Sequence, residues 1–144
     1  MSLTSDLTVE TVEWKKSKGV LQLLRYVVFV VEQKVPLELE LDGMDDTSAH
    51  FLASHLDDLP IGTGRLLPSG QIGRMAVLQG YRNKGVGSLI LSHILEFARQ
   101  NDYSQIFLHA QTHAMPFYER HGFTARGEEF MDAGIVHREM VIAD

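Results

Sequence analysis

A glycine-containing segment with basic side chains, Arg82–Gly87, has the composition of an anion-binding turn. It reads Arg-Asn-Lys-Gly-Val-Gly and precedes a predicted amphipathic helix. The first turn of a helix carries unpaired N–H groups and a partial positive charge, and glycine lets the backbone approach a phosphate closely. Two other phosphate loops fit less well, because a P-loop requires lysine where Val86 stands and a dinucleotide-binding turn requires glycine where Ile90 stands. Spacing alone leaves open a structural role, in which the glycines only let the helix pack tightly.

Two histidines four residues apart, His109 and His113, raise the question of a metal site. The zinc motif with this spacing needs a glutamate after the first histidine and a continuous helix, whereas this segment is predicted to leave a strand. The chain contains no cysteine, which removes thiolate ligands and any mechanism that carries an acyl group on a cysteine. We therefore expect no metal site. His109 is expected either beside a substrate cleft or as a hydrogen-bonded strand residue.

The acidic segment Glu38–Asp46 could collect a cationic substrate, or it could be a solvated loop with an Asp-Gly turn. The chain has 144 residues and a formal charge of −6, which argues against nucleic acid as a partner and mildly favours an amine. Its longest apolar run, Val27–Val31, is far shorter than the roughly 20 residues that span a bilayer. The N-terminal segment lacks the pattern of a signal peptide, so we expect a cytoplasmic protein with no membrane partner.

The hydrophobic pattern predicts one α+β domain over residues 1–144, with a mixed, mostly antiparallel central sheet flanked by helices. Short turns between three of the strands favour an antiparallel meander. The predicted strands are Leu7–Trp14, His50–Leu56, Ile61–Leu67, Gln71–Val77, Gln105–Ala110, Phe123–Glu128 and Val136–Ile142. The predicted helices are Gly19–Gln33, Leu89–Gln100 and Ala114–His121, and an acidic loop is predicted over Pro36–Asp46.

A second segment places the anion-binding turn in a family. Gln111–Phe123 runs from a strand end through a short helix with an aromatic pair to a Gly-Phe exit. It resembles the second signature of the GNAT superfamily of acyl-CoA-dependent N-acyltransferases, and Arg82–Gly87 resembles the first, Gln/Arg-x-x-Gly-x-Gly/Ala. The stretch Val30–Pro36, with the later Asp42 and Asp45, is similar to the ElaA-like branch of that family.

This resemblance implies an acetyl-CoA-dependent N-acetyltransferase with a GNAT-like sheet that splays open between Gln71–Val77 and Gln105–Ala110. The amide of Val77 or of its neighbour is expected to bind the thioester oxygen, and Tyr118 is expected to protonate the departing thiolate as a general acid. Spacing alone favours a core residue on an amphipathic helix for Tyr118, and the resemblance reverses that balance. The residues implied to bind the cofactor are Met75, Ala76, Val77, Arg82, Asn83, Lys84, Gly85, Val86, Gly87, Ser88 and Gln111.

The acceptor side departs from the family pattern. Many relatives carry a glutamate on the fourth strand that deprotonates the amine, whereas Gln71–Val77 has no acid. The candidate bases are His109, His113, Glu32 and Asp42, or a chain of water molecules, and Glu32, Asp42 and Asp45 are candidates for binding the acceptor. The acceptor is expected to be a small-molecule amine rather than a protein, and a homodimer is left open. The missing glutamate also motivates an alternative, a non-catalytic CoA-binding sensor or interaction domain.

Overall fold

The computed structural model describes residues 6–56 and 58–142, which form one seven-stranded sheet with helices on both faces. The strand order is β1-β2-β3-β4-β5-β7-β6, and every neighbouring pair is antiparallel except β4 with β5. The strands are β1 (Leu7–Val12), β2 (Ala49–His55), β3 (Leu59–Leu66), β4 (Gln71–Val77), β5 (Phe107–Gln111), β6 (Phe123–Asp132) and β7 (Ile135–Ile142). The predicted α+β class and mostly antiparallel sheet are confirmed.

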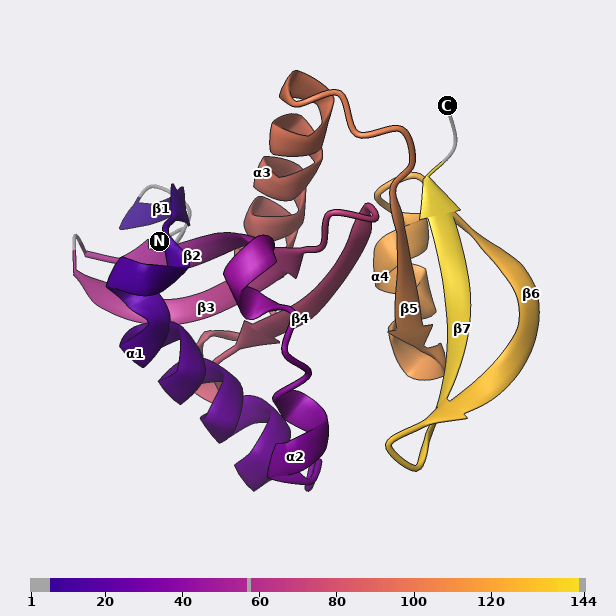
Figure 1. Cartoon of the computed structure of the whole chain (residues 1–144), viewed down its shortest axis with the longest axis horizontal. Helices are drawn as coiled ribbons and strands as arrows, with labels where there is room; N and C mark the ends of the chain where they lie inside the picture. Colours follow the sequence, from indigo (N-terminus) through magenta and orange to yellow (C-terminus); the bar gives the residue numbers. More distant parts are fainter. Residues whose placement is uncertain (1–5, 57, 143–144) are drawn as a thin grey trace.

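Helical segments connect these strands (Figure 1). They are α1 (Trp14–Arg25), the π-helical η2 (Tyr26–Glu32), α2 (Leu37–Glu40), η3 (Asp45–Thr47), η4 (Gln79–Tyr81), α3 (Val86–Gln100), η5 (Thr112–Ala114) and α4 (Met115–Glu119). Side chains alternate between the two faces of a strand, so Phe51 and Leu52 on β2 point in opposite directions. Phe51 packs in the core beneath α3, and Leu52 packs against Leu21 on α1. The two long helices therefore cover opposite faces of the sheet.

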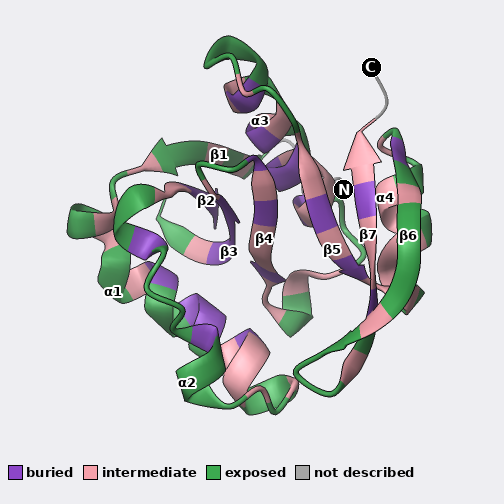
Figure 2. Cartoon of the chain, turned by 45° about the vertical axis from the view of Figure 1, so that its right-hand side comes forward, coloured by how far each residue is buried: buried purple, intermediate pink, exposed green. Residues whose placement is uncertain are grey.

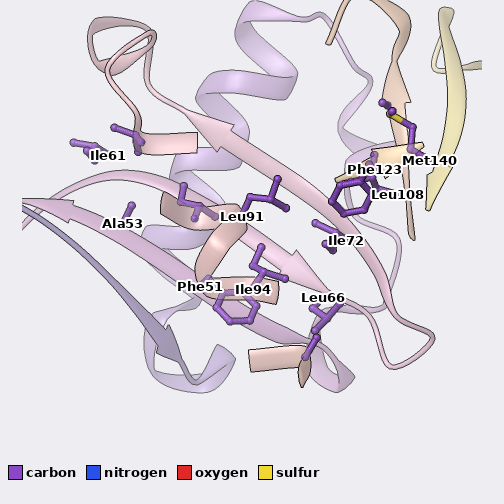
Figure 3. Close-up of a cluster of buried hydrophobic side chains, with 14 residues drawn as sticks. Phe51, Ala53, Ile61, Leu66, Ile72, Leu91, Ile94, Leu108, Phe123 and Met140 are labelled. Atoms are coloured by element: carbon purple, nitrogen blue, oxygen red, sulfur yellow. The ribbon is translucent and has the colours of Figure 1, made fainter. Parts of the chain in front are cut away.

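The larger core lies between α3 and the sheet (Figure 3). Ile90, Leu91 and Ile94 present one face of α3 to the sheet and are fully buried. A Cβ atom built on Gly64 of β3 would lie 2.9 Å from Ile94 Cδ1, so the absence of a side chain there allows the helix to approach β3 closely. Figure 2 shows buried residues along β4 and β5 and exposed residues along the outer strand β6. Burial is greatest in the inner strands β2 and β3, whereas most residues of the outer strand β6 are exposed.

The sheet opens between β4 and β5. Their register holds for only two pairs, Gln71 with Phe107 and Ile72 with Leu108, after which the strands separate. The register between β3 and β4 also shifts at Arg74, whose φ of +49° lies in the left-handed region. A bulge bends its strand and increases the local twist. The predicted splay between these two strands is therefore present, and β4 keeps one backbone edge unpaired beyond Ile72.

Several element boundaries differ from the sequence-based expectation. Trp14 begins α1 rather than ending β1, and the predicted helix Gly19–Gln33 is an α-helix to Arg25 followed by a π-helix. The polar first turn of α1 hid its start, since it contributes no apolar periodicity. The acidic stretch is also not a continuous loop, because it contains α2 and η3. Within the described residues, no helix combines the length and apolar character needed to cross a membrane.

Candidate active site

A cavity of about 310 Å³ lies where β4 and β5 separate. Its walls come from η2 and α2 on one side, from β4 and β5 at its base, and from α4 and the β6–β7 hairpin on the other side. Tyr118, His109 and Met75, all predicted site residues, line it together with Gln71 and Arg74. Residues far apart in the sequence therefore converge where β4 and β5 separate.

The backbone of Val77 faces the open side of β4. The Leu78 amide donates to the Ile61 carbonyl at 2.9 Å, and Val77 stands opposite Gly62 on β3. In an antiparallel ladder, hydrogen-bonded and non-hydrogen-bonded pairs alternate, so the N–H and C=O groups of Val77 point away from β3. Arg82 Nε accordingly reaches the Val77 carbonyl at 2.9 Å. The Val77 amide thus points to the edge of β4 that is not paired with β5.

The glycine turn closes directly onto the N-terminus of α3. Asn83 has φ +61° and Gly85 has φ +87°, and Gly85 is the N-cap residue of a helix that begins at Val86, three residues earlier than predicted. No side chain caps this N-terminus. The first N–H groups of a 15-residue helix are therefore available to an anion. The turn therefore presents unpaired backbone N–H groups with which an anion could form hydrogen bonds.

The side chains around this turn are partly engaged with the protein itself. Arg82 pairs with Glu32 at 2.9 Å in addition to its bond to Val77, so this arginine fastens the turn to η2 and to β4. Ser88 Oγ lies 3.0 Å from Nε2 of His121, which stands two residues after the end of α4. Lys84 is exposed. Glu32, a candidate for binding the acceptor, is thus placed in an ion pair beside the donor-side turn.

Tyr118 projects from α4 into the cavity. Its hydroxyl lies 4.0 Å from the sulfur of Met75 on β4, so the side chain spans the gap between the two halves of the sheet. Burial raises the pKa of Tyr118 to about 12. A phenol with a raised pKa stays protonated over the whole neutral range and can act only as a proton donor there. Gln111, predicted to contact the cofactor, donates to Gln33 Oε1 at 3.2 Å across the same gap.

The two candidate histidines occupy different places. His109 lines the cavity, with Nδ1 3.3 Å from Gln71 Nε2 and Nε2 3.2 Å from Glu139 Oε1. His113 is exposed in η5 and is not among the residues that line the cavity. The described residues contain no group of three or more His, Asp or Glu side chains arranged to hold a metal ion.

The two aspartates predicted to bind the acceptor belong to one charge cluster, in which Asp45 is buried and Asp42 is exposed. Asp42 pairs with Arg65 at 2.7 Å and with Arg74 at 3.2 Å, and Asp45 pairs with Arg25 at 2.8 Å and with Arg65 at 3.1 Å. Glu40 pairs with Arg25 as well. Burial raises the pKa of Asp42, but the hydrogen bonds and charge of Arg65 outweigh it and lower that pKa to about 2. These carboxylates hold the α2–η3 segment against the sheet.

The residues that sequence reasoning missed are the partners of the predicted ones. Gln71 and Glu139 contact His109, and Gln33 contacts Gln111, across separations of 30 to 78 residues. Arg74 received no predicted role, although the lack of an acidic residue on its strand, β4, is evident from the sequence. One signal was present in the sequence, because Arg74 and His109 stand in strands where apolar side chains would be expected to pack. The partners of these two residues carried no such local signal.

Comparison with known proteins agrees with this geometry. Residues 22–143 match the family model of the acetyltransferase (GNAT) domain. The chain is 38% identical over 122 residues to the uncharacterized N-acetyltransferase YjcF of Bacillus subtilis, covering 82% of this chain and 86% of that protein. It is 34% identical over 123 residues to the protein ElaA of Escherichia coli, with 79% of each covered.

Solved structures give the same result. An acyl-CoA N-acyltransferase from Pseudomonas aeruginosa is 33% identical with a TM-score of 0.80, covering 96% of this chain and 99% of that one. The crystal structure of Escherichia coli ElaA is 28% identical with a TM-score of 0.85, covering 95% and 99%. The open sheet, the glycine turn and these similarities agree: the chain belongs to the GNAT superfamily of acyltransferases, in its ElaA-like branch.

Proposed function

We propose that this protein transfers an acetyl group from acetyl-CoA to the primary amine of a small molecule, directly and within a ternary complex. The observation that carries the proposal is the cavity at the β4–β5 opening, which His109 lines, together with the uncapped N-terminus of α3 that follows β4 through the glycine turn. A direct transfer is favoured because the chain has no cysteine to carry the acyl group. A solved GNAT structure from Elizabethkingia anophelis that shares this fold is described with acetyl-CoA bound.

On the donor side, the unpaired edge of β4 fits the amide-containing arm of acetyl-CoA, and the backbone from Arg82 to Ser88 fits its pyrophosphate. The Val77 amide points to this edge and donates to the thioester oxygen, where negative charge builds up during attack. Met75 and Ala76 lie along the same edge. Acetyl-CoA supplies the activated acyl group, and the protein supplies position and hydrogen bonds.

On the leaving-group side, Tyr118 donates its phenolic proton to the sulfur as the C–S bond breaks. A pKa near 12 makes donation to an aqueous thiolate unfavourable, since thiols titrate near 8.5 in water. The same apolar surroundings that raise the pKa of Tyr118 also raise the basicity of a thiolate formed beside it, which restores the balance. The nitrogen loses its remaining excess proton on forming the amide, and that proton returns Tyr118 to its neutral state.

On the acceptor side, His109 is the candidate base that the cavity contains. An alkylammonium group with a pKa near 10.4 has no free electron pair, so a proton must leave before the nitrogen attacks. Asp42 already forms two ion pairs and Glu32 pairs with Arg82, which makes both poor proton acceptors. This placement supports an enzyme over the non-catalytic sensor that the missing strand glutamate suggests.

Thiol release from acetyl-CoA with a panel of small amines tests the proposal. Tyr118→Phe is expected to lower turnover about 10²- to 10⁴-fold with unchanged acetyl-CoA affinity by calorimetry, whereas Tyr26→Phe, at an exposed tyrosine, serves as its matched control. Gly85→Glu is expected to abolish acetyl-CoA binding, because it puts a side chain and a negative charge at a position with φ +87°. Tight binding without thiol release from any amine would instead identify a sensor.

A further inference from the structure

A row of three side chains crosses the strands beside the cavity. His109 on β5 stands directly opposite Glu139 on β7, and Glu139 stands directly opposite Arg126 on β6. Directly opposed residues in an antiparallel pair lie on the same face of the sheet. The contacts follow this register, with His109 Nε2 3.2 Å from Glu139 Oε1 and Arg126 Nε 2.8 Å from Glu139 Oε2. The backbone pairing itself therefore holds the three side chains in line.

These contacts fix which nitrogen of His109 carries the proton. An ionised carboxylate can only accept a hydrogen bond, so Nε2 is the N–H donor to Glu139 and Nδ1 keeps its lone pair. The hydrogen bond from Arg126 lowers the pKa of Glu139, which keeps this carboxylate charged at neutral pH. Phe130 meets the imidazole edge to face, with ring centroids 5.0 Å apart, and so limits its rotation.

The lone pair of Nδ1 lies on the cavity side. Its neighbour is Gln71 Nε2 at 3.3 Å, near the long end of the hydrogen-bond range, and both residues line the cavity. A nitrogen of the acceptor, or a water molecule bonded to it, can take the place of the Gln71 amide. The other titratable or charged side chains that line this cavity are Arg74 on β4, Glu40 on α2, Tyr118 on α4, Asp132 at the end of β6 and His137 on β7.

We propose that Glu139 and Arg126 are positioning residues that make His109 the proton acceptor for the acceptor's ammonium group. This inference rests on the proposed function. In the step, an N–H bond of the ammonium breaks and an Nδ1–H bond forms, which leaves a neutral amine with a free electron pair and an imidazolium. The amine then attacks the thioester carbon. Glu139 stabilises the imidazolium through the hydrogen bond to Nε2, as carboxylates do for catalytic histidines elsewhere.

The two positioning residues have opposite charges, and this gives a test that a purely structural role would not pass. A base must be unprotonated to work, so kcat/KM rises with pH along an acid limb. Glu139→Gln removes the negative charge beside the imidazole and leaves Arg126 nearby, which disfavours the imidazolium. We expect the acid limb to move down by about one pH unit and the plateau to fall about tenfold. Arg126→Gln removes the positive charge and should move the limb upward.

The experiment is the pH dependence of thiol release for the wild type, His109→Gln, Glu139→Gln and Arg126→Gln. His109→Gln is expected to lower kcat/KM by 10²-fold or more and to remove the acid limb. Glu129→Gln, at an exposed carboxylate on β6, is the matched control and is expected to keep the wild-type profile. His113→Gln completes the set, because a loss in this variant instead of His109→Gln would assign the base to His113.

The outcomes separate the inference from the function on which it rests. Opposite displacements of the acid limb in the Glu139 and Arg126 variants support the inference. An active wild type with unchanged limbs in both variants overturns it while leaving the acetyltransferase function standing. A wild type that binds acetyl-CoA and releases no thiol with any amine overturns the proposed function, and the role of His109 with it.

Discussion

Replacing Asp45 with asparagine is expected to destabilise the protein strongly, because Asp45 is the carboxylate that joins two buried arginines. Its two oxygens accept from Arg25 Nη1 and Nη2 at 2.8 and 3.2 Å, and one of them also accepts from Arg65 at 3.1 Å. Arg25 is 1% exposed, so water cannot replace the lost charge. Removing one partner of a buried ion pair costs about 3–5 kcal/mol.

Asparagine keeps one oxygen and nearly the same shape, and Glu40 still pairs with Arg25, so the lower end of that range applies. We expect a loss of about 3 kcal/mol, which corresponds to a decrease of roughly 1.5 M in the urea midpoint for an m-value of about 2 kcal/mol/M. Equilibrium urea unfolding measures both quantities. Asp46→Asn is the matched control, because Asp46 is the adjacent, exposed residue, and its effect should stay within about 0.5 kcal/mol. An Asp45→Asn variant as stable as this control would refute the assignment of a stabilising role to the cluster.

Three further predictions concern stability. The pKa of Asp42 is about 2 in the folded protein and about 3.9 in the unfolded chain. The contribution of Asp42 to the free energy of unfolding is therefore complete above about pH 4 and is lost as the pH falls towards 2. Urea midpoints at pH 6, 4 and 3 would reveal this loss. Gly70→Ala should destabilise the protein by at least about 2 kcal/mol in thermal melts, because φ is +96° and the new Cβ would lie 1.9 Å from the Gln105 carbonyl oxygen. Gly73→Ala is the control in the same melts, because the space around its Cβ is open. Gly64→Val should cost about 1–3 kcal/mol by overpacking α3, and a wild-type melting temperature would show that the helix can retreat.

The sequence predicted β4 and the turn before α3 well because the features that form them are local. The bounds of β4 are those expected, and Arg82–Gly87 does lead into a helix. Glycines with positive φ and a helix start are set by neighbouring residues in the chain. The start of α1 and the π-helical turn were missed because they are not set by local sequence alone. A polar first turn and the β-branched run Val27–Val31 carry no distinctive periodicity, and packing against the sheet decides their conformation.

The acceptor side was predicted only as a set of candidates. His109 was among them, but nothing near it in the sequence indicates Glu139 as its partner, because that contact exists only through the pairing of β5 with β7. The acidic segment shows the same limit. Its composition suggested either a surface that attracts cations or a solvated loop, whereas Asp45 is buried against arginines from α1 and β3. A charge run does not reveal whether its counter-charges are inside the protein.

The charge cluster connects the stability of the fold to the shape of the cavity proposed to bind the acceptor. Arg74 lines the cavity while its guanidinium donates to the carbonyls of Leu39 and Glu40 and to the carboxylate of Asp42. The wall formed by α2 is therefore held in place by the same residue that occupies the bulge of β4. A substitution that loosens the cluster should alter acceptor KM before it alters acetyl-CoA affinity, since the pyrophosphate turn and the Val77 amide depend on backbone geometry elsewhere in the chain. Selectivity for the amine can thus change without loss of the donor site.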